Sequence, residues 1–256
     1  MTSILYIGVD DTDIIGSVGT GRVAHGLAKC FSDLNLGISL GVSRHQLLVD
    51  KRIQYTSHNS SKGLAIKTDR QPADFVEPAI EYMKTCYLPG SDPGLCICAE
   101  NQINNEIMRF GQRAITEVLS KKDSLNLAAK YNVFLRELGG SGDGIIGALA
   151  AVGLRAWGNE GRLVDLPGIH DFKGRVTVGE ILAGSPITAV QDEDGHRIDN
   201  SEIIESFNWI RPSLVGGAPV LRVRPVLTGK DRRWVMIEQK HREKGEGDSD
   251  GKQHDD

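Results

Sequence analysis

The sequence predicts a mixed α+β (α/β) fold. Short apolar runs bounded by glycine and proline alternate with segments in which apolar residues recur every three or four positions. This alternation is typical of a chain that forms both strands and helices. Hydrophobic residues make up 39% and charged residues 25% of the 256 positions, which is the composition of a globular protein with a sizeable core.

Each element follows from a local pattern. An apolar run predicts a buried strand over 4–9, and Val23, Leu27 and Phe31 recur at the spacing of a helix expected over 20–34. Pro72 predicts a helix that carries proline in its first turn. Further strands are expected over 36–42, 46–49, 62–67, 95–99 and 132–138, and further helices over 106–119 and 143–152.

The pattern divides the chain into three regions. A first domain is expected over 1–165, a small β-rich region over 166–239 and a disordered tail over 240–256, where apolar residues are nearly absent. Asp194-Gly195 predicts a hairpin turn inside the second region. We expect this region to consist mainly of short strands.

Charge and cysteine content narrow the function classes. With 34 acidic and 30 basic residues the net charge is −4, which speaks against a strongly basic nucleic-acid binder. The sequence shows neither a signal peptide nor an apolar run of membrane-spanning length, so we expect a cytoplasmic protein without a membrane partner. Its cysteines should stay reduced, and Cys96 and Cys98 should be buried thiols rather than zinc ligands. A homo-oligomer is compatible with this composition.

The first candidate site directly follows the first strand. Asp10, Asp11 and Asp13 place three carboxylates within four residues, and their mutual repulsion is costly unless a cation neutralises it. Mg²⁺ uses one or two protein carboxylates and takes further ligands from water and phosphates. We therefore predict a magnesium site that serves nucleotide chemistry, the alternative being an exposed acidic turn.

A glycine-rich turn comes next. Gly19, Thr20 and Gly21 open the helix over 20–34, where free backbone N–H groups can bind phosphate. The segment is not a P-loop, because Arg22 and Val23 stand where that motif requires Lys and Ser or Thr. The alternative is structural, with Thr20 as the helix N-cap.

A second glycine-rich turn precedes the helix over 143–152. Gly142, Gly144 and Gly147 satisfy G-x-G-x-x-G around Asp143, and Asp165 follows at about the distance of a ribose-binding acid. These glycines could bind nucleotide phosphates. The same pattern keeps a dinucleotide-dependent oxidoreductase open as an alternative.

Two polar segments supply candidate substrate-binding residues. His58, Asn59 and Lys62 lie within one hydroxyl-rich stretch, in which the ammonium group could pair with a phosphate. Asp92 lies in a Pro-Gly turn. Each segment, taken alone, also fits a plain polar turn.

Taken together, the motifs resemble the archaeal 2-agmatinylcytidine synthetases of isoleucine tRNA (agmatidine synthetases, TiaS). The matching segments occur in the family's order, namely Asp10-Asp11-Thr12-Asp13 with Thr20, Ser57-His58-Asn59 with Lys62-Gly63, Ser91-Asp92-Pro93-Gly94, and 142–153. The resemblance covers about residues 3–165, which would correspond to the family's kinase domain.

The resemblance implies specific roles. The family binds ATP and Mg²⁺, phosphorylates a tRNA cytidine and lets agmatine displace the phosphate. Asp10, Asp11 and Asp13 would then hold the metal and the triphosphate, and Thr20 matches a threonine that accepts phosphate. Gly142, Gly144 and Gly147 would line the nucleotide phosphates.

This sequence also departs from the family. It has no C-x-x-C zinc ribbon and no recognisable OB-fold, and only 166–239 offers room for a counterpart of the family's ferredoxin-like domain. We therefore expect a small-molecule acceptor or a partner subunit, rather than tRNA bound by this chain alone.

The function that we predict is a Mg-ATP-dependent phosphotransferase or synthetase, in which Asp10, Asp11 and Thr20 are the candidate catalytic residues. The alternatives are an NAD(P)-dependent oxidoreductase, a magnesium phosphatase, for which Asp11-x-Asp13 after a strand would be the signature, and a non-catalytic nucleotide or metabolite sensor.

Overall fold

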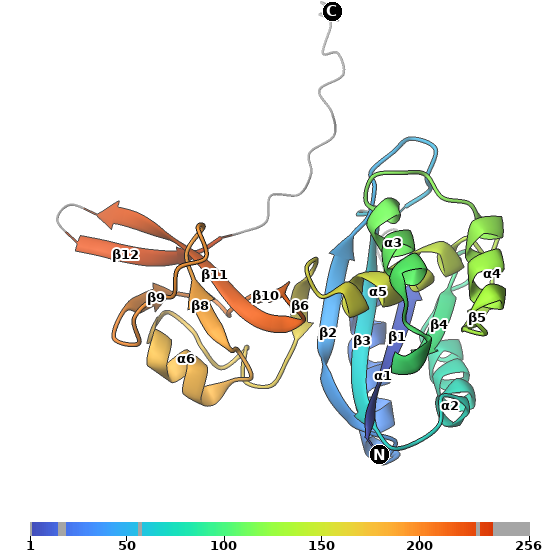
Figure 1. The fold of residues 1–256 in the computed structure, drawn as a ribbon, viewed down its shortest axis with the longest axis horizontal. Helices are drawn as coiled ribbons and strands as arrows, with labels where there is room; N and C mark the ends of the chain where they lie inside the picture. Colours follow the sequence, from blue (N-terminus) through green and yellow to red (C-terminus); the bar gives the residue numbers. More distant parts are fainter. Residues whose placement is uncertain (1, 15–18, 56–57, 229–230, 238–256) are drawn as a thin grey trace, which may run out of the picture.

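The computed structural model describes residues 2–14, 19–55, 58–228 and 231–237 (Figure 1). Within them lie six α-helices and twelve strands, which confirms the predicted mixed α+β class. The tail expected over 240–256 lies outside the described residues. None of the described helices has the length and apolarity needed to cross a membrane.

The first part of the chain forms a βαββαβ unit. Its elements are β1 (Ser3–Asp10), α1 (Thr20–Asp33), β2 (Ile38–Gln46), β3 (Ser60–Thr68), α2 (Ala73–Lys84) and β4 (Gly94–Ala99). The strands lie in the order β4-β1-β3-β2, and every neighbouring pair is antiparallel. This is the ferredoxin-like arrangement. The strand expected over 36–42 is β2, which extends to Gln46 and has an irregularity in its pairing to β3 between Ser39 and Val42. The strand expected over 46–49 is wrong, because residues 47–49 belong to no strand.

The next elements complete the first lobe. They are a 3₁₀ turn (Glu100–Gln102), α3 (Asn105–Ala114), α4 (Lys121–Lys130), β5 (Phe134–Glu137) and α5 (Gly144–Trp157). Strand β5 extends the sheet beside β4. The helix expected over 106–119 ends at Ala114, and the sequence pattern did not predict α4.

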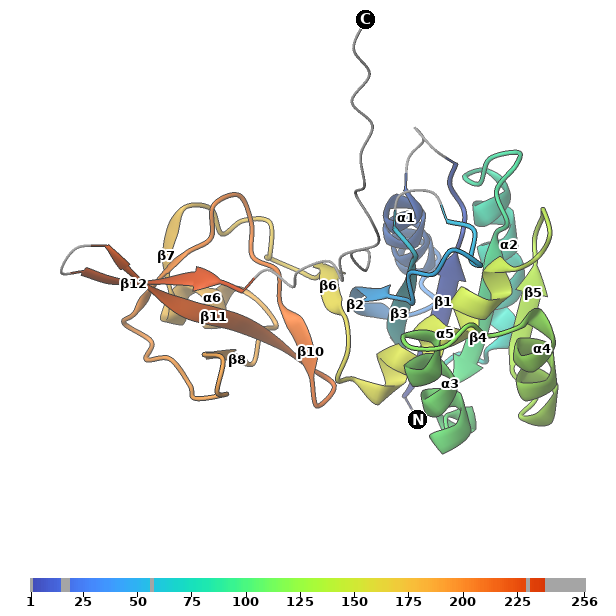
Figure 2. The ribbon, with the colours of Figure 1, turned by 90° about the horizontal axis from the view of Figure 1, so that it is seen from above.

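The sheet of the first lobe carries helices on both faces (Figure 2). Val23, Leu27 and Phe31 of α1 and Phe75 of α2 pack with the apolar residues of β1 and β3 on one face. Helix α5 crosses the other face, and α3 and α4 cover it from outside. Because α5 is buried along nearly its whole length, it is apolar on all sides, as expected of a helix between two layers.

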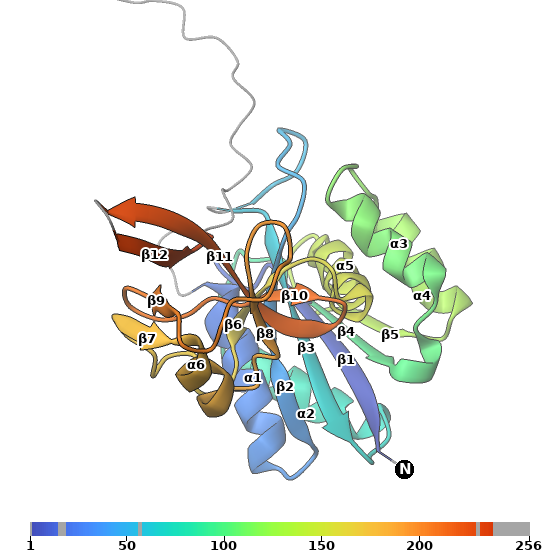
Figure 3. The same cartoon turned by 60° about the vertical axis from the view of Figure 1, so that its left-hand side comes forward.

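The second lobe has a core of its own. It contains β6 (Arg162–Asp165), β7 (Arg175–Thr177), α6 (Val178–Gly184), β8 (Ala189–Gln191), β9 (Ile203–Glu205), β10 (Ser213–Val215), β11 (Ala218–Thr228) and β12 (Asp231–Met236). Strand β6 pairs with β2 on one side and with β10 on the other. The two lobes therefore share one continuous sheet, with β6 at the junction (Figure 3).

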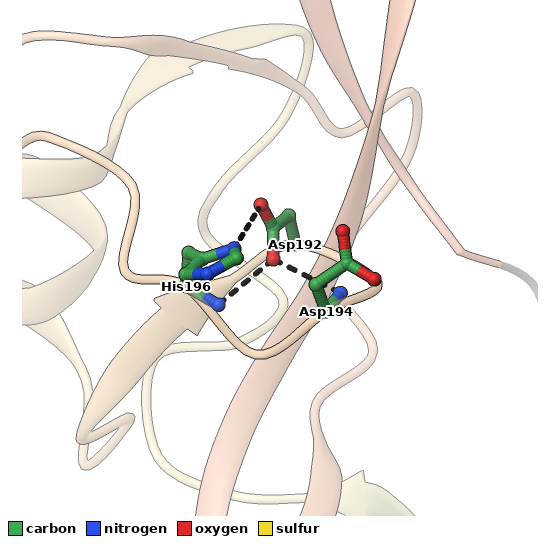
Figure 4. A group of neighbouring side chains, drawn as sticks. All are labelled: Asp192, Asp194 and His196. Carbon is green, nitrogen blue, oxygen red and sulfur yellow. Dashed lines mark hydrogen bonds and ion pairs between the residues drawn. The ribbon is translucent and has the colours of Figure 1, made fainter.

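The hairpin turn predicted at Asp194-Gly195 is confirmed (Figure 4). A β-bridge joins Gln191 and Arg197 on either side of it. The Asp192 carboxylate accepts backbone N–H groups from Asp194 at 3.0 Å and from His196 at 2.8 Å. The polar side chains in Figure 4 thus stabilise a turn.

Candidate functional site

A cavity of about 490 Å³ opens where β1 ends and where α1 and α5 begin. It brings together ten of the predicted site residues, from four separate segments of the chain: Asp10, Asp11, Asp13, Thr20, His58, Asn59, Asp92, Asp143, Gly144 and Gly147. A larger hollow of about 870 Å³ lies in the second lobe, lined by residues of β11 and β12 together with Glu193, Phe207 and Ile237. It holds none of the predicted site residues.

Strand β1 delivers Asp10 into the wall of the cavity. Burial raises the pKa of its carboxyl group to about 7, against the attraction of Lys62, and the charges of Asp11 and Asp13 raise it further. Gly147 of α5 lies directly opposite, and an added Cβ there would overlap the Asp10 carboxylate. Glycine at this position allows α5 to approach the end of β1.

The chain turns sharply after Asp10. Asp11 adopts a left-handed conformation with φ of 52°, which few residues other than glycine, asparagine and aspartate accept. Burial raises the pKa of the Asp11 carboxyl group to about 6, and the charges of Asp92, Asp13 and Asp143 add to this rise. The turn thus directs Asp11 toward carboxylates from two other segments.

These carboxylates fit a cation, although they do not form a closed cage. Among the described residues, only the exposed group of Asp192, Asp194 and His196 brings three potential ligand atoms within 4.8 Å of one another. Mg²⁺ does not need such a cage, because water and phosphate supply most of its ligands. Burial is the main cause of the raised pKa values of Asp10 and Asp11, and the charges of neighbouring carboxylates add to it.

Thr20 links the acidic turn to helix α1. Its hydroxyl donates to Asp13 Oδ1 at 2.8 Å and accepts hydrogen bonds from the backbone and side chain of Thr12, at 3.3 and 3.1 Å. The N-cap of α1 is Gly19, so Thr20 is the first helical residue and the alternative of an N-cap at Thr20 is wrong. The buried Thr12, which the sequence pattern did not single out, completes this network.

Four predicted residues do not line the cavity, namely Gly19, Gly21, Lys62 and Gly142. Lys62 is buried behind Asp10, and its Nζ donates to the carbonyl and hydroxyl oxygens of Ser60 at 3.1 and 3.3 Å. Burial lowers the pKa of Lys62 to about 8, against the opposing effect of Asp10. Gly21 lies against the Lys62 side chain, and Gly19 near Asp13.

Asp92 holds the second glycine-rich turn in place. Its carboxylate accepts hydrogen bonds from the backbone N–H and the hydroxyl group of Ser141. An added Cβ at Gly144 would overlap the Asp92 carbonyl, and one at Gly142 would overlap Glu137. Close packing therefore explains these two glycines, and the first turn of α5 lines the cavity.

The far wall of the cavity was not predicted. It comes from the loop after β2 and from the α3–α4 connection, and its members are Leu47, Arg52, Ile53, Tyr55, Val118, Leu119 and Lys121. Lys121 pairs with Glu137 at 2.7 Å and donates to the Ser141 carbonyl at 2.8 Å. Asn59 is held in this loop by its own hydrogen bond to the Leu48 carbonyl, at 2.6 Å, and His58 is exposed.

The sheet argues against the dinucleotide alternative. Dinucleotide-binding folds place their glycine motif between parallel neighbouring strands. Here every strand pair of the first lobe is antiparallel, and β5 and β6, which flank α5 in sequence, lie on opposite sides of β1 to β4. The spacing of Gly142, Gly144 and Gly147 therefore does not indicate a dinucleotide site here, because the parallel sheet of such sites is absent from the described part of the first lobe.

The comparison with solved structures finds a common fold. A complex of TiaS with an isoleucine tRNA and ATP is 24% identical, with a TM-score of 0.52 over 59% of this chain and 36% of that one. Over this part of its length, the chain shares the fold of part of TiaS. Apo TiaS, an agmatidine synthetase of isoleucine tRNA, is 23% identical with a TM-score of 0.51, over 59% of this chain and 35% of that one. A tRNA fluorescent labeling enzyme is 24% identical with a TM-score of 0.52, over 59% and 36%.

The likeness confirms the predicted resemblance at the level of the fold. This chain spans about a third of the length of those proteins. No family model matches the sequence, and no curated protein matches it. Because one TiaS structure is a complex with tRNA, the expectation that this chain acts without tRNA finds no support in the comparison.

Proposed function

We propose that this chain is an ATP-using enzyme of the ligase or phosphotransferase type, which depends on magnesium and activates an acceptor by phosphorylation. The observation that carries the proposal is the convergence of Asp10, Asp11, Asp13, Asp92 and Asp143 in one cavity at the N-termini of α1 and α5. Helix N-termini attract phosphate, while a carboxylate cluster repels it unless a cation lies between them.

The residues of the cavity would bind the metal ion, bind the phosphates and accept a proton. Asp10, Asp11 and Asp13 would hold Mg²⁺, which neutralises phosphate charge when it is bound. The backbone N–H groups at the start of α5 and at Gly19 to Gly21 would contact phosphate oxygens. The Thr20 hydroxyl donates to Asp13, so this carboxylate is placed to take a proton if the hydroxyl accepts a phosphoryl group.

Two TiaS complexes support the choice of ligands. One contains an isoleucine tRNA and ATP, and another contains an isoleucine tRNA, AMPCPP and agmatine. We therefore propose ATP as the nucleotide and tRNA as the first acceptor to test, with a small molecule or a partner subunit as the second candidate. The antiparallel sheet disfavours a dinucleotide.

A thermal-shift panel tests nucleotide choice. The full chain is heated with ATP, ADP, NAD or NADP, each with and without Mg²⁺. Ligand at a hundredfold excess over its Kd adds about 2.7 kcal/mol to the unfolding free energy, so stabilisation by ATP in the presence of Mg²⁺ is expected. Stabilisation by NAD or NADP alone would contradict the proposal.

A turnover assay then tests the chemistry. We expect release of ADP or AMP from labelled ATP to rise when unmodified tRNA is added together with an amine such as agmatine. A rise with a small phosphate acceptor but not with tRNA would assign the second class of acceptor. ATP binding without turnover under any of these conditions would indicate a sensor and refute the enzyme assignment.

A further inference from the structure

Positive charge is scarce in the wall of the cavity of about 490 Å³. Of the described residues that line it, only Arg52 and Lys121 are arginine or lysine. The same wall carries the carboxyl groups of Asp10, Asp11, Asp13, Asp92, Glu117 and Asp143. A nucleoside triphosphate has more negative charge than one Mg²⁺ neutralises, and enzymes that bind it supply further cations from the protein. The question is therefore which of the two side chains is able to contact a phosphate.

Lys121 is held by the second glycine-rich turn. Its Nζ pairs with the Glu137 carboxylate at 2.7 Å and donates to the Ser141 carbonyl at 2.8 Å. A move of Lys121 toward a ligand would break both contacts and leave a carboxylate and a carbonyl oxygen without this donor. Lys121 thus stabilises the turn before α5.

Arg52 is held only by a residue of its own loop among the described residues. Its Nε and Nη2 donate to the two carboxylate oxygens of Asp50, each at 2.8 Å. The Arg52 side chain is 66% exposed, and water and salt weaken ion pairs at such positions. A phosphate group offers the same pair of acceptor oxygens with more negative charge. Phosphate can therefore displace the Asp50 carboxylate from the guanidinium group.

The turn that carries Arg52 does not depend on this ion pair. The backbone N–H of Arg52 donates to Asp50 Oδ1 at 2.9 Å, and that of Ile53 donates to the Asp50 carbonyl at 3.0 Å. An aspartate that accepts the N–H two residues along is a common way to form a turn. Both bonds remain when the guanidinium group moves. Ile53 and Tyr55 also line the cavity, so the turn keeps Arg52 at the wall while its side chain changes partners.

We propose that Arg52 is a phosphate-binding residue of the nucleotide site, and that its guanidinium group leaves Asp50 for phosphate oxygens when ATP binds. Asp50 does not line the cavity, so in the free protein it holds the guanidinium group beside the site without occupying it. The N-termini of α1 and α5 and the Arg52 side chain then contact the phosphates from different walls. The inference rests on the proposed function, because it assigns Arg52 to the same nucleotide site.

Calorimetric titration of the full chain with ATP in the presence of Mg²⁺ tests the proposal. Arg52→Gln should bind ATP at least about tenfold more weakly than the wild type, because a hydrogen-bonded contact between two charged groups is lost. Arg52→Lys keeps the charge without the planar fork and should have an intermediate affinity. Lys51→Gln is the matched control: it removes the same charge one residue earlier, at an exposed position outside the cavity wall, and should bind as the wild type does.

Asp50→Asn separates phosphate binding from a structural role of the ion pair. Asparagine still accepts the backbone N–H of Arg52 through Oδ1, so the turn should remain, while the charged partner of the guanidinium group is gone. This variant should bind ATP at least as tightly as the wild type. If Asp50→Asn and Arg52→Gln are weakened equally, the ion pair itself shapes the cavity and the inference is overturned. Unchanged ATP affinity in Arg52→Gln would overturn it as well.

The proposed function and the role of Arg52 fail on different results. If the wild type binds ATP with Mg²⁺ but never turns it over, the enzyme assignment fails, and weaker binding by Arg52→Gln still establishes the phosphate contact. If the wild type turns ATP over and Arg52→Gln binds it equally well, only the role of Arg52 fails. Absence of ATP binding by the wild type would refute both. The unfolding midpoints of all variants without ligand should equal that of the wild type, because Arg52 and Lys51 are exposed.

Discussion

Substitution of Asp11 by asparagine removes one negative charge from the cavity and keeps the shape of the side chain. Asp11 lies at φ of 52°, and asparagine accepts this left-handed conformation as readily as aspartate does. The backbone turn should therefore survive. Any change in the free energy of unfolding then reports the cost of the charge, which makes this variant a direct test of the electrostatics of the site.

The magnitude follows from the pKa of the carboxyl group. Burial, with the charges of Asp92, Asp13 and Asp143, raises it from 3.8 to about 6 in the folded protein. One pKa unit corresponds to about 1.36 kcal/mol. A group whose pKa is raised on folding contributes stability below its unfolded pKa, and this contribution is lost as pH rises through the folded value. Without metal, Asp11→Asn should be nearly silent at about pH 4 and more stable than the wild type by about 1–3 kcal/mol at about pH 8.

Urea denaturation at both pH values, in the presence of a chelator, measures the difference. Other titrating groups are present in both proteins and cancel when the two curves are subtracted. Asp171→Asn, at an exposed position in the second lobe, is the control for removing one carboxylate elsewhere in the protein. Addition of Mg²⁺ should stabilise the wild type and not Asp11→Asn.

Destabilisation of Asp11→Asn at about pH 8 would refute the reasoning, because the charged carboxylate would then be making favourable contacts within the protein. A stability change of the same size at both pH values would refute it as well. Either result would assign Asp11 a purely structural part in the turn.

Three further results are expected. Thr20→Ala should lower the free energy of unfolding by about 1–3 kcal/mol in urea denaturation and reduce ATP turnover by at least about 100-fold. Near-normal turnover in this variant, together with no transfer of label from γ-labelled ATP to Thr20 in the wild type, would show that Thr20 is only structural. Gly147→Ala should displace the Asp10 carboxylate and abolish magnesium-dependent nucleotide binding in a calorimetric titration. This is expected even though alanine is more favourable than glycine in a helix by about 1 kcal/mol. Normal binding would place Asp10 outside the site. Burial lowers the pKa of His45 to about 3. The free energy of unfolding should therefore fall as pH falls below about 6.5, because only the unfolded chain takes up the proton. His45→Gln should weaken this pH dependence in urea denaturation, and an unchanged dependence of the unfolding free energy on pH would contradict the prediction.

The local elements were predictable where a buried pattern is carried by consecutive residues. The apolar run over 4–9 became β1, and the spacing of Val23, Leu27 and Phe31 became the buried face of α1. Helix α4 was missed because its sequence, KKDSLNLAAK, buries only Ser124 and Ala128, so no apolar stripe marks it. The strand order β4-β1-β3-β2 was also not predictable, since pairing depends on residues far apart in the chain.

The candidate site also has a part that the sequence predicted and a part that it did not. Asp10, Asp11, Asp13 and Thr20 lie within one short segment, and their grouping was visible in the sequence. The opposite wall was not, because the loop after β2 and the α3–α4 connection reach the cavity only through tertiary packing. The glycines at the start of α5 were recognised as candidates for binding nucleotide phosphates, with a dinucleotide turn as the alternative. In the structure Gly147 lines the cavity and also makes room for Asp10.

Strand β6 contributes neighbouring side chains to two different cores. Val164 packs against the core of the first lobe, and Leu163 is buried in that of the second. Its backbone also joins the two lobes, because β6 pairs with β2 on one side and with β10 on the other. A chain cut after Asp165 would expose Leu163 to water, and one that starts after Asp165 would lose the partner of β10. The two lobes should therefore melt in a single transition, and neither should be obtained intact by dividing the gene at this point.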